Sequence, residues 1–166
     1  MDAAQLPGVD MVMLLAPISL DRARRAAEQV VDPEIPVLTI ADLGILRDVE
    51  VVDDRVVVTI TPTYSGCPAM AAIEDDLRLA LADAGFKRVE VVTVQHPPWT
   101  SDWMTDEGRE KLARFGIAPP SPDAAVTCPR CRAGSPREVS RFGSTACKAL
   151  MVCTSCGDPF DRFKEF

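Results

Sequence analysis

The 166-residue sequence contains no long hydrophobic segment. Its longest apolar run near the start, residues 11–18, is interrupted by Pro17 and is far shorter than a membrane span. Asp2 and Asp10 lie where a signal peptide would carry basic residues. We therefore expect a cytoplasmic protein with no membrane partner.

The sequence also lacks a glycine-rich phosphate loop, a cofactor motif and the paired carboxylate motif of helical di-iron sites. Its net charge of −7 repels a phosphate backbone, so we expect no nucleic-acid partner. The single histidine, His96, could act as a base for a cysteine, but nothing in the sequence brings it near one. We accordingly predict no catalytic residues, and an enzyme with a thiol nucleophile is the least favoured hypothesis.

Charge and proline content divide the chain into two modules. Residues 123–166 carry seven basic and five acidic side chains, a net charge of +2, whereas the rest carries −9. Three prolines lie within residues 118–123, a composition typical of a semi-rigid linker. We predict an N-terminal extension (1–18), a first domain (19–117), a linker (118–126) and a small C-terminal module (127–166).

Hydrophobic periodicity predicts the elements of the first domain. Helical spacing begins after Ser19 and ends before Asp32, and a second helical pattern runs from Pro68 to Gly85. Residues 45–52 and 55–61 are rich in Val and Ile and flank a turn, as expected for an antiparallel hairpin. A strand is expected at 88–94 and a helix at 105–115. The prediction is an α+β fold with α-β-β-α-β-α order, followed by a four-cysteine zinc ribbon.

Four of the six cysteines form two Cys-x-x-Cys pairs in the tail, Cys128/Cys131 and Cys153/Cys156. The pairs are separated by 21 residues, close to the spacing of four-thiolate zinc modules. A tail this short needs a bound metal ion of this kind to fold. Four thiolates also accommodate iron, so a redox-active iron centre is the alternative. Cys147 is either an extra ligand or a small buried residue.

Cys67 lies between Gly66 and Pro68 at the expected start of the second helix. Helix N-termini stabilise thiolates, so Cys67 is either a reactive thiol or a buried small hydrophobe. Asp32 and Glu34 lie in the proline-stiffened segment 32–36. They are either turn-capping or solvated acids, or carboxylates held rigidly towards a metal or partner.

Three segments of the sequence resemble those of an iron-sulfur assembly family that includes bacterial SufT-like proteins. They are Asp-Pro-Glu-Ile-Pro at 32–36, Asp-Leu-Gly at 42–44 and Thr-x-Thr-Tyr-Ser-Gly-Cys-Pro at 61–68, and the resemblance covers about residues 19–95. It implies that Cys67 corresponds to the family's reactive cysteine and that Asp32 and Glu34 form its acidic loop. A transiently held iron ion or iron-sulfur cluster would be the cargo of that site.

With Pro-Pro-Trp at 97–99, the cysteine pairs and the ending Gly-Asp-Pro-Phe-Asp-Arg-Phe-Lys at 157–164, the whole chain is similar to the PaaD family of phenylacetyl-CoA epoxidase systems. That resemblance implies a non-catalytic maturation or accessory factor in aerobic phenylacetate degradation. Its partners would be the epoxidase subunits, above all the iron-sulfur and flavin reductase, and a homodimer is expected. The alternative is an electron-transfer component with iron on the four tail cysteines.

Overall fold

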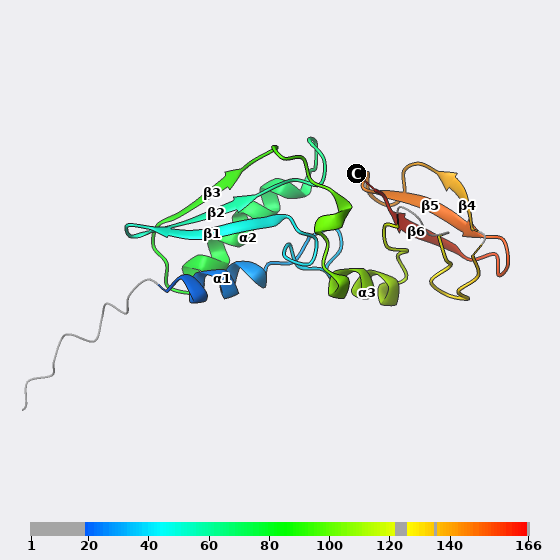
Figure 1. The fold of residues 1–166 in the computed structure, drawn as a ribbon, viewed down its shortest axis with the longest axis horizontal. Coiled ribbons are helices and arrows are strands. Elements are labelled where there is room, and N and C mark those ends of the chain that lie inside the picture. Colours follow the sequence, from blue (N-terminus) through cyan, green and yellow to red (C-terminus); the bar gives the residue numbers. More distant parts are fainter. Residues whose placement is uncertain (1–18, 122–125, 135, 166) are drawn as a thin grey trace, which may run out of the picture.

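The computed structural model describes residues 19–121, 126–134 and 136–165, which fold into two packed parts (Figure 1). The predicted N-terminal extension lies outside the described residues. None of the helices in these ranges is both long and apolar enough to cross a membrane.

The first part is a three-stranded sheet with two helices packed on it and a third helix leading towards the tail (Figure 1). Strands β1 and β2 form the expected antiparallel hairpin, and β3 pairs with β2 in parallel. Because α2 connects β2 to β3, these three elements form a βαβ unit. The elements in chain order are α1 (Leu20–Glu28), β1 (Leu46–Val52), β2 (Arg55–Ile60), α2 (Ala69–Asp83), β3 (Val89–Thr93), the 3₁₀ turn η1 (Ser101–Trp103) and α3 (Asp106–Phe115).

Local sequence signals set the ends of the helices. The Ser19 side chain accepts a hydrogen bond from the backbone N–H of Arg22 and caps α1, and Thr105 caps α3 in the same way through Gly108. Gly116 ends α3 in the left-handed conformation, with φ of 91°. The inner faces of α1 and α2 place Ala23, Ala27, Ile73, Leu77 and Leu81 in the core against the sheet. The predicted helices and hairpin are therefore present; most ends lie within two residues of the prediction, and α1 ends three residues earlier than expected.

The second part is a small antiparallel sheet of β4 (Pro136–Ser140), β5 (Lys148–Cys153) and β6 (Pro159–Phe163), in the order β4-β5-β6. Its own apolar cluster is small and consists of Ala118, Cys128, Ala149, Met151, Cys153 and Phe160. A core of this size is marginal, so the cysteine pairs carry much of the stability of this part.

The two parts share a packed interface. Phe163 at the end of β6 is buried in the core cluster of the first part, where its ring lies 6.1 Å from that of Trp99. Ala118 forms a bridge with Arg162, and its N–H donates to the carbonyl of Asp161 at 2.8 Å. Arg109 of α3 donates to the carbonyls of Ser101 and Pro120. The start of the predicted linker is thus fixed at the edge of the ribbon.

Candidate functional site

The four paired cysteines converge at one end of the ribbon. The sulfurs of Cys128, Cys131, Cys153 and Cys156 all lie within 4.8 Å of one another. The Cys131–Cys153 and Cys128–Cys156 sulfurs are 3.5 and 3.8 Å apart. A tetrahedral zinc ion with Zn–S bonds of about 2.3 Å separates its sulfurs by about 3.8 Å. The donor set and its spacing therefore fit a four-thiolate zinc ion.

A cation is needed for all four thiols of this cluster to be ionised together. Backbone N–H groups of Cys156 and Ser155 point at the Cys153 sulfur and help lower the pKa of its thiol to about 6. The N–H of Asp158 favours the Cys156 thiolate, but burial and hydrogen bonding with the neighbouring sulfurs raise its pKa to about 12. Four such thiols cannot all ionise side by side without a positive ion among them.

The acidic segment 32–36 forms a loop that is closed by backbone and side-chain hydrogen bonds. Val31 and Thr39 pair at its base, and the N–H of Asp32 donates to the carbonyl of Leu38 at 2.9 Å. Oδ1 of Asp32 accepts hydrogen bonds from the N–H groups of Glu34 and Ile35, both at 2.8 Å. Asp32 is 6% exposed, and its burial raises the pKa of its carboxyl despite those bonds and the charge of Lys148. Asp32 thus forms the turn, and its carboxyl group is buried.

Cys67 is half-buried and lies two residues before Ala69, the first residue of α2. The N–H of Ala69 and the hydroxyl of Thr63 both favour its thiolate, as expected at a helix start. Burial outweighs them, however, and the charges of Glu34 and Asp32 add to the effect, so the pKa of the Cys67 thiol is raised. The partial burial of the sulfur is therefore the main reason why the helix start does not lower the pKa of this thiol.

Cys147 occupies a different place from the other tail cysteines. It is 5% exposed and belongs to the core cluster of the first part, against which Tyr64 and Cys67 also pack. Its sulfur lies 3.0 Å from the Thr145 hydroxyl. Among the described residues, the group of clustered ligand atoms consists of the four paired cysteines and does not include Cys147.

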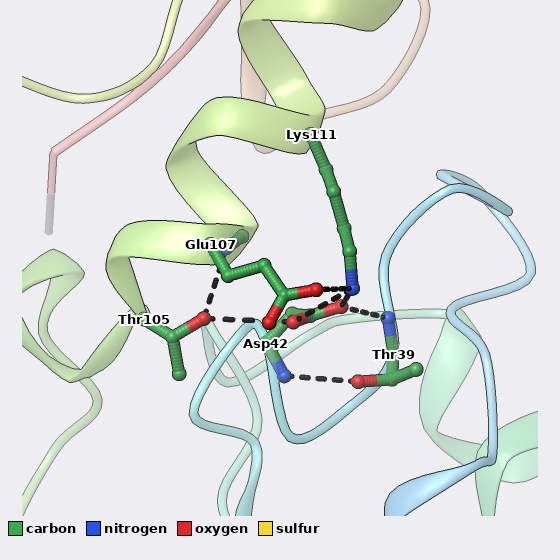
Figure 2. A network of polar contacts seen from close by, with 6 residues as sticks. Thr39, Asp42, Thr105, Glu107 and Lys111 are labelled. Atoms are coloured by element: carbon green, nitrogen blue, oxygen red, sulfur yellow. Dashed lines mark hydrogen bonds and ion pairs between the residues drawn. The ribbon is translucent and has the colours of Figure 1, made fainter.

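Asp42 joins the loop before β1 to helix α3 (Figure 2). Its carboxylate accepts hydrogen bonds from the Lys111 ammonium, at 2.9 Å, and from the N–H of Thr39. Burial opposes ionisation, but these bonds outweigh it and lower the pKa of the Asp42 carboxyl. Glu107 also pairs with Lys111, and Thr105 contacts Asp42 from the start of α3. The Asp-Leu-Gly segment therefore has a structural role.

Trp99 and Trp103 both pack into or against the core of the first part. The Trp99 Nε1–H donates to the carbonyl of Leu43 at 2.9 Å. Beside Trp99 a cavity of about 480 Å³ opens, and Tyr64 and the exposed His96 line it. Tyr64 belongs to the same segment as Cys67, whose N–H donates to the Tyr64 carbonyl at 3.1 Å.

The comparisons with known proteins agree with both parts of the chain. Residues 20–95 match the family model described as iron-sulfur cluster assembly protein, and residues 116–164 match the PaaD zinc beta ribbon domain. A protein of Escherichia coli (strain K12) that carries the provisional name of a 1,2-phenylacetyl-CoA epoxidase component is 45% identical over 90% of this chain and 95% of its own. The chain belongs to the PaaD family.

Other relatives of this PaaD protein match the first part alone. The Fe-S protein maturation auxiliary factor YitW of Bacillus subtilis (strain 168) is 45% identical over 48% of this chain and 79% of its own. The crystal structure of a DUF59 domain from Bacillus anthracis superposes with a TM-score of 0.53 at 29% identity, covering 56% of this chain and 90% of that one. The PaaD chain therefore joins an iron-sulfur assembly domain to a zinc ribbon, as the sequence resemblance implied.

The structure brings Cys67 near Asp32 and Glu34, whose charges act on its thiol, and it gathers the four paired cysteines elsewhere. Lys148 has no role predictable from the sequence, yet it is 4% exposed and close enough for its charge to act on Asp32. The sequence likewise does not determine whether Cys147 is a metal ligand or a buried core residue. Neither residue lies in a recognisable spacing motif, so only the packing of the ribbon on the first part reveals them.

Proposed function

We propose that this PaaD-family protein is a non-catalytic maturation factor for a phenylacetyl-CoA epoxidase system. It holds iron or a small iron-sulfur cluster transiently at Cys67 and transfers it to a client subunit. The client we favour is the reductase that carries the iron-sulfur and flavin centres, and the protein works in the cytoplasm. The kinship of its first part with Fe-S protein maturation auxiliary factors carries this proposal.

The site chemistry supports a transient cargo rather than a resident cofactor. A thiol is a soft ligand suited to iron and to iron-sulfur clusters. Within the part of the chain that the structure describes, only the four ribbon cysteines bring three or more ligand atoms within 4.8 Å. Cys67 therefore offers few protein ligands, which leaves coordination positions for a client's own cysteines. The neighbouring carboxylates Asp32 and Glu34 favour a positively charged cargo.

The ribbon ion has a structural role in this proposal. Four thiolates that close around one ion leave no position for a substrate, as in structural zinc sites. A second candidate, an electron-transfer component, is favoured by one observation, which is that the same four-thiolate set also binds redox-active iron. Reversible bleaching of a purified, iron-loaded ribbon by dithionite would support that candidate.

The test is to express the epoxidase system in cells together with wild-type protein, Cys67→Ser or Ser65→Ala. Ser65→Ala is the matched control, because Ser65 is an exposed neighbour on the same segment. We expect Cys67→Ser to accumulate as a folded, zinc-containing protein while the reductase is isolated with a reduced iron and sulfide content. A reductase with its full iron and sulfide content alongside Cys67→Ser would refute the proposal.

A further inference from the structure

The ribbon contains two tight turns, one for each Cys-x-x-Cys pair, and they differ at the residue that follows the pair. After the second pair, Gly157 has a φ of 77° and donates its N–H to the carbonyl of Cys153 at 2.9 Å. After the first pair, Arg132 has a φ of 61° and donates in the same way to the carbonyl of Cys128 at 2.8 Å. The first turn therefore carries an arginine at the position where the second carries a glycine.

The left-handed backbone of Arg132 is unfavourable for a residue with a side chain. At positive φ the Cβ atom crowds the following carbonyl oxygen, whereas glycine has no Cβ and adopts this conformation freely. The hydrogen bond to Cys128 needs only the backbone, so a glycine would form the same turn without this cost. Residues other than glycine that persist in such conformations cluster at functional sites. The turn itself thus gives no reason for an arginine here, which points to a function of the side chain.

Arg132 lines a cavity between the first of these turns and the end of α3. The cavity has a volume of about 450 Å³, and Arg114 of α3 and Thr127 also line it. Arg114 and Arg132 are exposed, and neither forms an ion pair or a side-chain hydrogen bond with any residue in the described ranges. Arg130 in the same turn, by contrast, is paired with Asp158 at 2.6 Å. Two unpaired guanidinium groups and a hydroxyl group are donors that suit a carboxylate or another oxyanion.

Arg114 also lines a second hollow, of about 280 Å³, together with Val37, Lys111 and Phe115. The ring of Phe115, at the end of α3, is 56% exposed. The ammonium group of Lys111 is already paired with Asp42 at 2.9 Å. The exposed ring and the aliphatic carbons of Arg114 therefore suit an apolar side chain better than a second charge. An acidic hollow-filling group and an apolar one would thus lie next to each other, on either side of Arg114.

We propose that Arg114, Arg132 and Phe115 form a docking site for an acidic segment of a partner protein. A carboxylate of that segment binds to the two guanidinium groups, and a neighbouring apolar residue covers Phe115. A free phosphate would use only the basic cavity and leave the ring exposed, so the two adjoining hollows favour a peptide. The site uses neither Cys67 nor the zinc ligands, and it goes beyond the proposed function.

The first test is the substitution Arg132→Gly in the zinc-loaded, full-length protein. We expect its melting temperature to rise by about 2 °C, because the unfavourable backbone conformation is relieved, and its zinc content to stay unchanged. A lower melting temperature or a loss of zinc would overturn the inference, because the arginine would then serve the turn or the metal site.

The second test measures binding of a capped peptide of two glutamates followed by two leucines, by NMR titration of the same protein. We expect Arg132→Gly and Arg114→Gln each to weaken binding about fivefold. The control Arg137→Gln removes the same charge from an exposed position on β4 and should bind like wild type. The same peptide with glutamines in place of the glutamates should not bind.

Three results of this titration would overturn the docking site. They are no binding of the acidic peptide to wild type, equal weakening by Arg137→Gln, and tighter binding of inorganic phosphate than of the peptide. The last result would mean that the cavity serves a small oxyanion. None of them bears on the role of Cys67, so the proposed function stands or falls separately.

Discussion

Asp32 shows how one side chain serves both the fold and the candidate site. Its Oδ1 accepts the two backbone bonds that close the acidic loop, while its charge acts on the Cys67 thiol. An asparagine retains the accepting oxygen and removes the charge, whereas an alanine removes both. The two substitutions therefore separate the structural contribution of Asp32 from its electrostatic one.

We predict that Asp32→Ala lowers the free energy of unfolding by about 1–3 kcal/mol, because the buried N–H of Ile35 and the partly buried N–H of Glu34 lose their acceptor. Asp32→Asn should retain most of that stability, since the turn remains. Both variants should hold less iron per chain after anaerobic purification, because the acidic loop has lost a charge beside the thiol. Urea unfolding and iron analysis check the pair, and equal instability of the two variants would contradict the turn-forming role.

Asp42 is the carboxylate for which the structure predicts a clear pH dependence. Its pKa in the folded protein is below the ordinary value of 3.8, so ionised Asp42 stabilises the fold at neutral pH. That contribution is fully present above about pH 3.8 and is lost as the pH falls through the lower pKa of the folded state.

We predict that Asp42→Asn destabilises the protein by about 1–3 kcal/mol at pH 7, because the partly buried ion pair with Lys111 is broken. The difference from wild type should shrink as the pH is lowered towards 3. Glu107→Gln is the control, since its side chain is 72% exposed and its pair with Lys111 contributes little. A pH-independent difference in urea unfolding would show that the charge of Asp42 is not the cause.

At the level of elements, α3 is positioned by close backbone contact with the loop before β1. A Cβ on Gly108 would lie 2.8 Å from the carbonyl oxygen of Asp42 and 3.0 Å from its Cβ. We predict that Gly108→Ala destabilises the fold by about 1–3 kcal/mol, although alanine normally favours a helix interior by about 1 kcal/mol. Thermal unfolding checks the sign, and a stabilised variant would mean that α3 shifts freely on the loop.

The elements themselves follow from the sequence because their signals are local. Ser19, Thr105 and Gly116 mark helix ends, and the Asp53-Asp54 turn joins two runs of β-branched residues. The family resemblance predicts a cargo site at Cys67, and the Cys-x-x-Cys spacing predicts the cluster of four ribbon cysteines that the structure shows. The parallel pairing of β3 with β2 was not foreseen, because it depends on which segments meet in space. The sequence also left open whether Cys67 is a reactive thiol or a buried residue, and the structure shows it half-buried with a raised pKa.

On the scale of the whole molecule, the ribbon and the assembly domain form one packed unit. Phe163 is 1% exposed and contacts the core of the first part, and Cys147 lies in that same core. The proline-rich stretch predicts a separator between two modules, although Ala118 within it pairs with β6 residue Arg162. Composition indicates where a linker lies but not whether the modules it joins pack together.

We predict that removing zinc, by a chelator or by Cys128→Ser, destabilises the assembly domain as well as the ribbon. Loss of the ribbon fold withdraws Phe163 and Cys147 from the shared core, and loss of a large buried aromatic costs about 3–5 kcal/mol. Calorimetry should show one cooperative transition for the zinc protein and a lower-melting assembly domain without zinc. An unchanged melting temperature of that domain would contradict the shared core.

The measurement that tests the central claim most directly is the content of zinc, iron and acid-labile sulfide per chain after purification without oxygen. It is made for wild type, Cys67→Ser and Cys128→Ser, together with the visible spectrum of each. The account predicts that zinc is lost only in Cys128→Ser and that substoichiometric iron or cluster is lost in Cys67→Ser. Stoichiometric, redox-active iron that depends on Cys128 and not on Cys67 would contradict it and favour an electron-transfer component.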